Sequence, residues 1–176
     1  MPPELLTIDH SGYADVGAQQ RRGERNGRLA HLELKDVILT PGVQPHEVAL
    51  AALNVGRSAI GAGNAQHAVD AFQSVRELVD SGPLWTEATD YLARVLLGGG
   101  EAQLGLVLAD QLQNSGVRAD YCRWLRAQGL AQTGRPAEAL TELAGIEEIV
   151  DTAGRRHDPA ALKTLRALCG ELLAAG

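Results

Sequence analysis

Apolar residues recur at helical spacing along most of the chain from residue 46 onward. Gly63 ends a first apolar stripe with a residue suited to the left-handed conformation, and Pro83 begins a later helix in its first turn. Residues 46–81 are therefore predicted to form a helical hairpin with a short turn. Its second helix carries apolar residues at intervals of three and four, which form one amphipathic stripe: Ala65, Ala68, Val69, Phe72, Val75 and Val79.

The same arrangement recurs twice more. Helices are predicted over 84–97 and 119–132, and each is followed by a partner helix, the first ending before Gly116 and the second spanning 136–150. The turn glycines at 63, 100 and 134 are separated by 37 and 34 residues, a period typical of stacked helical pairs. A last helix over 159–174 is expected to cap the stack. Its apolar residues are predicted to face inward: Leu162, Leu165, Leu168, Cys169 and Leu172.

The tetratricopeptide pattern has a small residue, an alanine twelve positions on, and a large apolar residue four beyond. Two sets of residues fit it: Gly56, Ala68 and Phe72, and Ala127, Ala139 and Leu143. The middle pair departs from it, with Ala93, Gly105 and Ala109 at these positions. The stretch LAQTGRPAEALTEL, residues 130–143, resembles the turn region of tetratricopeptide repeats. The resemblance implies an all-α, tetratricopeptide-like helical-hairpin solenoid of about three pairs plus a capping helix.

Composition narrows the possible partners. The chain has 16 basic and 22 acidic residues, a formal net charge of −6, which disfavours nucleic acid and anionic membrane surfaces. Neither a secretory signal nor an apolar run of membrane-spanning length is visible in the sequence. We therefore expect a cytoplasmic protein without nucleic acid or membrane partners. Cys122 and Cys169 lie in apolar helical stretches and are expected to be buried free thiols.

A basic segment precedes the repeats. Residues 14–39 read as one helix, with Leu29, Leu32 and Val37 on roughly one side. Its first half carries arginines that share a face, at positions 21, 25 and 28. This face is either simply solvated or suited to docking onto an acidic surface or a phosphate.

The front of the chain resembles a junction found in bacterial family-2 glycosyltransferases. In that family a strand of the form I-x-H-x-G-Y closes the catalytic domain, and a helix containing R-x-x-R-N-x-x-L leads into tetratricopeptide repeats. The matching residues are Ile8, His10, Gly12 and Tyr13 for the strand, and Arg22, Arg25, Asn26 and Leu29 for the helix, with Gly27 in place of a larger residue. The resemblance implies a remnant of a catalytic α/β domain over 1–13, a linker helix over 14–40, repeats over 41–154 and a capping helix over 155–176.

The catalytic half that the resemblance implies would need roughly 220 further residues. In the family an Asp-x-Asp motif holds Mg²⁺ or Mn²⁺ against the sugar-nucleotide diphosphate, and no two aspartates in this sequence stand two positions apart. His10 matches a position that could contact a metal in an intact enzyme. The resemblance implies glycosyltransferase activity only for a longer protein that includes the catalytic half. For this chain alone we predict no catalytic residues, no metal site and no cofactor.

A stacked-hairpin protein offers the first helix of each pair along a groove. By analogy with tetratricopeptide domains, the predicted partner-binding groove is formed by Asn54, Arg57, Asp90, Tyr91, Arg94, Tyr121, Trp124 and Gln128. The alternative is that the three aromatic residues simply pack between repeats. We expect a protein-interaction or dimerisation domain whose partner is a protein or peptide, its own catalytic domain, or a second copy. The alternative function is a free-standing tetratricopeptide adaptor unrelated to glycosyl transfer.

Overall fold

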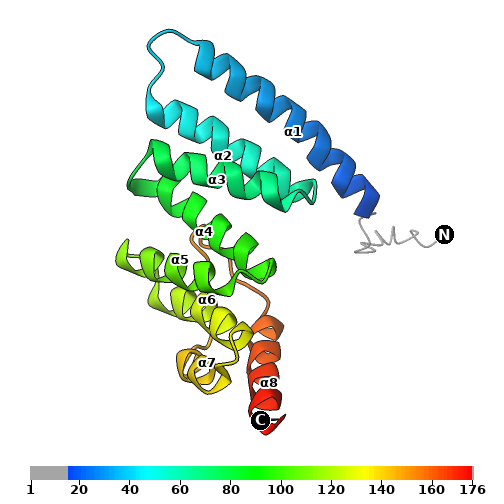
Figure 1. The fold of residues 1–176 in the computed structure, drawn as a ribbon, viewed down its shortest axis with the longest axis vertical. Helices are drawn as coiled ribbons and strands as arrows, with labels where there is room; N and C mark the ends of the chain where they lie inside the picture. Colours follow the sequence, from blue (N-terminus) through cyan, green and yellow to red (C-terminus); the bar gives the residue numbers. More distant parts are fainter. Residues whose placement is uncertain (1–15, 176) are drawn as a thin grey trace, which may run out of the picture.

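The computed structural model describes residues 16–175, and side chains are described for residues 21–174. Within that part the chain is all-α (Figure 1). Its helices are α1 (Val16–Leu39), α2 (Pro45–Gly61), α3 (Ala65–Leu78), α4 (Gly82–Gly98), α5 (Ala102–Asn114), α6 (Ala119–Gln132), α7 (Pro136–Leu143) and α8 (Pro159–Ala175). The strand predicted around residues 8–13, including His10, lies outside the described residues.

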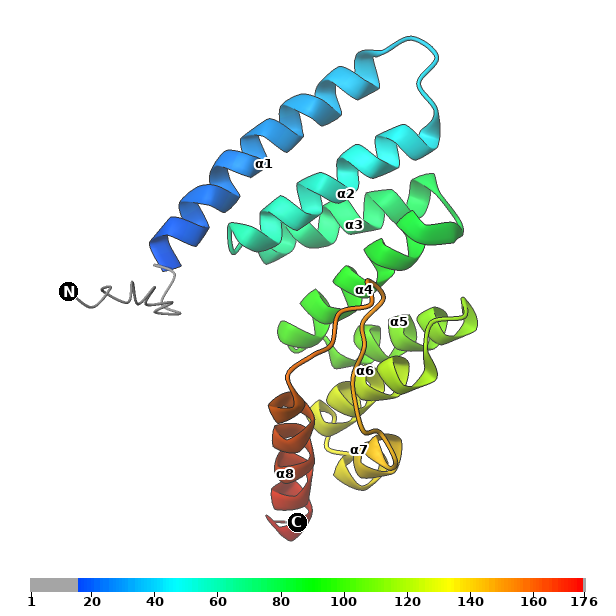
Figure 2. The same cartoon turned by 180° about the vertical axis from the view of Figure 1, so that it is seen from behind.

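The helices form an elongated stack in which each one packs against the next along the chain. Three of them also contact one another in order along one side of the stack, because α2 reaches α4 and α4 reaches α6. We call the surface that these three helices share the α2–α4–α6 face. Seen from behind, the connection between α7 and α8 runs up across α6 and α4 before it returns to α8 (Figure 2).

The predicted turns are confirmed at the three glycines that set the period. Gly63, Gly100 and Gly134 have φ angles of 74°, 83° and 73°, in the left-handed region that glycine adopts without steric cost. Pro83 and Pro136 lie in the first turns of α4 and α7, where a missing backbone N–H costs nothing. The helix boundaries before residue 136 therefore follow from the local sequence.

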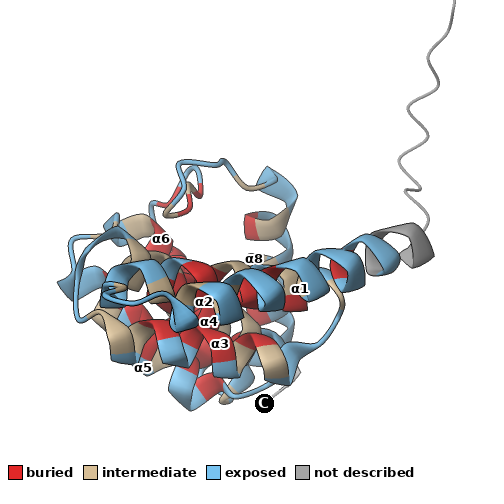
Figure 3. Cartoon of the chain, turned by 90° about the horizontal axis from the view of Figure 1, so that it is seen from above, coloured by how far each residue is buried: buried red, intermediate tan, exposed pale blue. Residues whose placement is uncertain are grey.

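The core is a main apolar cluster that follows the stack from α2 to α8, beside a smaller cluster of Ala30, Val55 and Ala71 where α1 meets the first hairpin. Buried residues line the surfaces between neighbouring helices, while exposed residues cover the outside (Figure 3). Glycines allow close approach within two of the hairpins. A Cβ on Gly56 would lie 2.4 Å from the ring of Phe72, and a Cβ on Gly105 would lie 2.5 Å from the Leu97 side chain. Gly105 therefore lets α4 and α5 approach closely, although its set departs from the tetratricopeptide pattern.

The helix predicted over 136–150 is wrong in its second half, because α7 ends at Leu143. Gly145 has a φ of 75°, which a helix cannot continue through. Arginines from other helices bind the carbonyls at this end: Arg123 donates to Ala144 at 2.8 Å, and Arg166 donates to Leu143 and Ile146, both at 2.8 Å. Residues 144–158 form a long connection whose only described strand-like feature is a single antiparallel bridge between residues 150 and 156.

The last helix buries less of its apolar stripe than predicted. Leu162 and Cys169 are buried, but Leu168 and Leu172 are 46% and 41% exposed. The reason is that α8 contacts only α6 and α7. These two helices cover one side of α8 and leave its last two turns partly open.

Candidate functional site

The predicted groove residues lie on the α2–α4–α6 face, and contacts join them from helix to helix. On α2, Arg57 Nη1 donates a hydrogen bond to Asn54 Oδ1 at 3.2 Å. Its Nη2 forms an ion pair with Glu87 on α4. Arg57 therefore links the first two helices of the face and leaves 40% of its side chain exposed.

Tyr91 occupies the middle of the face between two arginines. The guanidinium carbons of Arg57 and Arg94 lie 6.0 and 4.7 Å from the centre of its ring, a geometry in which a cation is attracted to the ring face. The ring also stacks on Phe72, with centroids 5.1 Å apart. Tyr91 is only partly buried, so this part of the face remains accessible.

Asp90 is the polar centre of the site and is 1% exposed. Its Oδ1 accepts a hydrogen bond from the Tyr121 hydroxyl at 2.5 Å, and its Oδ2 accepts one from the Thr152 hydroxyl at 2.5 Å. Arg94 Nε lies 3.3 Å from Oδ1. Burial, together with the charge of Asp90, raises the pKa of Tyr121 well above its ordinary value. The phenol is therefore a permanent donor to the carboxylate.

Thr152 belongs to a segment that we call the strap, Ile146–Asp158, which covers part of the face. The strap is held internally by Asp151, whose carboxylate accepts hydrogen bonds from the backbone N–H groups of Ala153 and Arg155 at 3.0 and 2.9 Å. The Arg155 side chain adds a hydrogen bond at 2.9 Å. Burial acts to raise the pKa of Asp151, but these hydrogen bonds and the Arg155 charge outweigh it and lower the pKa.

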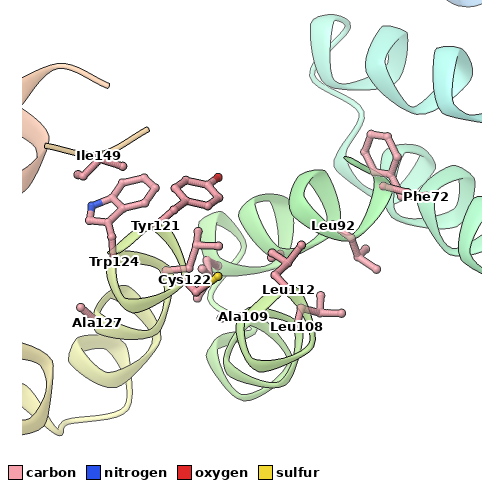
Figure 4. Packing of buried hydrophobic residues seen from close by; sticks show 14 of the residues in the cluster. Phe72, Leu92, Leu108, Ala109, Leu112, Tyr121, Cys122, Trp124, Ala127 and Ile149 are labelled. Atoms are coloured by element: carbon pink, nitrogen blue, oxygen red, sulfur yellow. The ribbon is translucent and has the colours of Figure 1, made fainter. Parts of the chain in front are cut away.

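The other end of the strap lies against the aromatic residues of α6. The His157 ring meets Trp124 edge-on at a centroid distance of 4.9 Å and lies 6.0 Å from the Tyr121 ring. Ile149, which is 3% exposed, points toward the Trp124 ring (Figure 4). The strap therefore covers Asp90, Tyr121 and Trp124, three residues that the sequence analysis predicted to bind a partner.

The predicted groove needs correction at three positions. Asp90, Tyr121 and Trp124 are 1%, 0% and 8% exposed, so they present no open surface while the strap is in place. The physical reason is that the chain itself supplies the contacts that were expected from a partner. The remaining five predicted residues are only partly buried or exposed: Asn54, Arg57, Tyr91, Arg94 and Gln128.

Sequence reasoning missed Thr152 and His157, because AGRRHD, residues 153–158, has the composition of a polar loop and Thr152 falls at the end of the predicted repeats. The only available signal was the presence of Ile146 and Ile149, two large apolar residues next to this loop. Both are buried, at 2% and 3% exposure. They indicate that the connection lies on the protein body.

A second hollow lies between α1 and the first hairpin. It is a mainly apolar groove of about 790 Å³ whose lining includes Leu32, Val55 and Ala59. At its edge His31 Nδ1 donates to the Gly27 carbonyl at 2.8 Å, and the Nε2 atoms of His31 and His67 lie 3.1 Å apart. Among the described residues, these two histidines belong to no group of three His, Cys, Asp or Glu side chains that could hold a metal ion.

None of the described helices combines the length and the apolar composition that crossing a membrane requires. Comparisons of this chain with protein-family models, with curated proteins and with solved structures found no match.

Proposed function

We propose that this chain is a tetratricopeptide-like interaction module that binds an extended peptide on its α2–α4–α6 face. One observation carries the proposal: this face already holds a separate segment of polypeptide, the strap, through side chains of α4 and α6. A surface that binds one peptide segment by a buried carboxylate and two aromatic rings has the chemistry to bind another.

The repeat character is supported by helix order and by spacing. The first helices of the successive pairs, α2, α4 and α6, contact one another in a row, as they do in stacked-hairpin proteins. The turn glycines keep a period of 37 and 34 residues with the same left-handed φ. The close approach at Gly56 lies at the small-residue position of the first pair, and that at Gly105 lies at the alanine position of the second pair.

The open half of the face has suitable groups for a peptide backbone. Asn54 offers an amide and Arg57 a guanidinium, and Tyr91 offers a ring beside them. Arg57 is already oriented by Asn54 and Glu87, so little conformational freedom is lost when it binds a carbonyl or a carboxylate. Arginine and tyrosine are also the residue types that most often dominate interface energies.

The test is a selection of displayed 12-residue peptides on the full chain, followed by affinity measurements with purified peptides. Arg57→Ala is expected to weaken binding by about 1–2 kcal/mol, which is typical of an interface truncation. Arg135→Ala is the matched control, because Arg135 pairs with Glu138 on α7, away from the face. Peptides whose binding is unaffected by Arg57→Ala but weakened by Arg135→Ala would contradict the proposal.

A second candidate function is supported by α1. The four residues that match the family-2 glycosyltransferase helix, Arg22, Arg25, Asn26 and Leu29, fall at i, i+3, i+4 and i+7, on one face of the helix. All four are exposed, and Leu29 is 58% exposed. The neighbouring face of α1 packs on α2, where a Cβ on Gly23 would lie 2.3 Å from the Gly61 carbonyl carbon.

This exposed stripe supports the proposal that the module is the repeat region of a family-2 glycosyltransferase-like protein, with a catalytic domain docked on α1. The test is the coding sequence upstream of residue 1 in the same frame. An α/β domain with an Asp-x-Asp motif supports the proposal, whereas an immediate in-frame stop codon overturns it and leaves the free-standing adaptor. Use of the module for dimerisation is tested separately by sedimentation velocity.

A further inference from the structure

The strap has two parts that differ in how they are held. Its base belongs to the core, because Ile146 and Ile149 are buried and the Ile146 carbonyl accepts a hydrogen bond from Arg166 on α8. Its tip, residues 150–156, is closed by the bridge between Val150 and Arg156 and by hydrogen bonds to Asp151 within the tip itself. A two-stranded hairpin of this size has little stability of its own.

The tip is fixed to the α2–α4–α6 face by few contacts. The hydrogen bond from Thr152 to Asp90 is a direct polar link to α4, and His157 follows at the aromatic pair of α6. Arg155 and Arg156 at the end of the hairpin are 61% and 77% exposed. The tip therefore contacts the face through the Thr152 hydroxyl and through Arg155, which interacts with Tyr91, and the His157 ring contacts the face just after the tip.

With the strap in place, the α2–α4–α6 face still has a hydrogen-bond donor without an acceptor. Arg94 Nε forms an ion pair with Asp90 at 3.3 Å without hydrogen-bond geometry, and Arg94 Nη2 is buried without a hydrogen-bond partner. A buried N–H group without an acceptor is unfavourable. An occupant that brings an oxygen acceptor to Arg94, such as a carboxylate or a backbone carbonyl, gains an interaction that the strap does not provide.

We infer that the strap is a displaceable internal ligand that occludes the α4–α6 half of the peptide site. The external partner is a peptide that repeats the strap's chemistry, with a serine or threonine hydroxyl for Asp90 and a flat ring for Tyr121 and Trp124, and adds an acceptor for Arg94. This inference rests on the proposed function, because it names the class of peptide and the step that controls access to the same face.

The decisive experiment removes the tip of the strap from the chain and adds the strap back as a separate peptide. In the open variant, residues 150–157 are replaced by Gly-Asn-Gly. The backbone N–H of His157 donates to the Ile149 carbonyl at 2.9 Å, so the two ends are close enough for a short turn, and Ile146 and Ile149 remain in the core. The probe is a fluorescently labelled synthetic peptide of residues 148–158. Binding is measured by anisotropy, while circular dichroism and thermal melting report on folding.

The open variant is expected to bind this peptide at least tenfold more tightly than the full chain, because the tethered strap competes at a high effective concentration. A peptide carrying Thr152→Val and His157→Ala is the matched control and should bind at least fivefold more weakly. Equal affinity of the open variant and the full chain for the probe overturns the inference, as does the absence of binding by a folded open variant.

A point variant of the full chain keeps the inference falsifiable if the open variant does not fold. Thr152→Val with His157→Ala removes the hydrogen bond to Asp90 and the ring contact with α6, and it leaves the chain length unchanged. It is expected to bind the same probe at least threefold more tightly than the unmodified chain, and no gain in affinity overturns the inference.

Failure of the inference is distinguishable from failure of the proposed function. If displayed peptides bind the full chain and the open variant equally, and Arg57→Ala weakens both, the face binds peptides and the strap does not control it. If no displayed peptide binds the face in either protein, the proposed function fails and the inference fails with it.

Discussion

The ring of Phe72 lies directly against the backbone of Gly56, so closely that a Cβ on residue 56 would come within 2.4 Å of the ring. Phe72 is fully buried, and its ring also stacks on Tyr91, so it has little room to move. We expect Gly56→Ala to lower the free energy of unfolding by about 1–3 kcal/mol, the usual cost of overpacking a core. Urea denaturation measures the change.

Gly170→Ala is the matched control for that substitution. Gly170 lies inside α8, is exposed, and an added Cβ would have no atom within 4 Å. Alanine should therefore stabilise the helix by about 0.5–1 kcal/mol. A Gly56→Ala protein as stable as Gly170→Ala would show that α2 and α3 are not in close contact.

Arg126 joins three helices. From α6 it donates to Gln113 on α5 at 2.6 Å, pairs with Asp110 on α5 at 3.2 Å, and pairs with Glu142 on α7 at 3.3 Å. Only 16% of the Arg126 side chain and 26% of the Glu142 side chain are exposed, so this ion pair is partly shielded from water, whereas Asp110 is 63% exposed. We expect Arg126→Ala to cost about 1–3 kcal/mol of stability, measured by urea denaturation.

Arg135→Ala serves as the control for charge removal. Arg135 and Glu138 form a solvent-exposed pair one turn apart on α7, and such pairs contribute little to stability. Its unfolding midpoint should match that of the unmodified chain. If both arginine variants were equally stable, the three-helix contact of Arg126 would have no energetic role.

The lowered pKa of Asp151 predicts that the stability of the folded chain depends on pH. Because its pKa is lower in the folded chain than in the unfolded one, the ionised carboxylate stabilises the fold at any pH above its ordinary value of about 3.9. This contribution is lost as the pH falls through the lowered pKa. Asp151→Asn should therefore be less stable than the unmodified chain at pH 7, and the gap should close below about pH 4.

Thermal melting between pH 7 and pH 3 measures that gap. Glu148→Gln is the control, because Glu148 is an exposed residue at the base of the strap and pairs with the exposed Arg156. Its melting curve should follow that of the unmodified chain across the whole range. A stability gap for Asp151→Asn that is constant with pH would show that the carboxylate charge does not hold the strap.

Both thiols should be unreactive in the folded protein. Cys122 and Cys169 are buried and free, and burial raises the pKa of Cys122 to about 11 and shifts that of Cys169 upward. Since the thiolate is the reactive form, a disulfide reagent at pH 8 should label neither cysteine natively and both in urea. Rapid native labelling of Cys169 would show that α8 leaves the stack.

The helix positions could be predicted from the sequence because their signals are local. The glycines at 63, 100 and 134 have the left-handed φ that a turn requires, and Pro83 and Pro136 begin helices as expected. The end of α7 could not be predicted in this way. Leu143, Ile146 and Ile149 keep the three-residue spacing of an amphipathic helix, so the apolar pattern does not reveal that the helix ends at Leu143. That end is stabilised by Arg123 and Arg166, which come from other helices.

The sequence by itself therefore determined the helical pairs, their turns, and the set of residues that share the α2–α4–α6 face, because each depends on periodicity and backbone preference over a few residues. Only the tertiary structure decided which of those residues are open. Asp90 and Thr152 are 62 residues apart, and no local pattern reports that a strap after α7 returns to α4. Whether Tyr121 and Trp124 face water or the strap depends on that long-range contact, so their burial is a property of the folded chain.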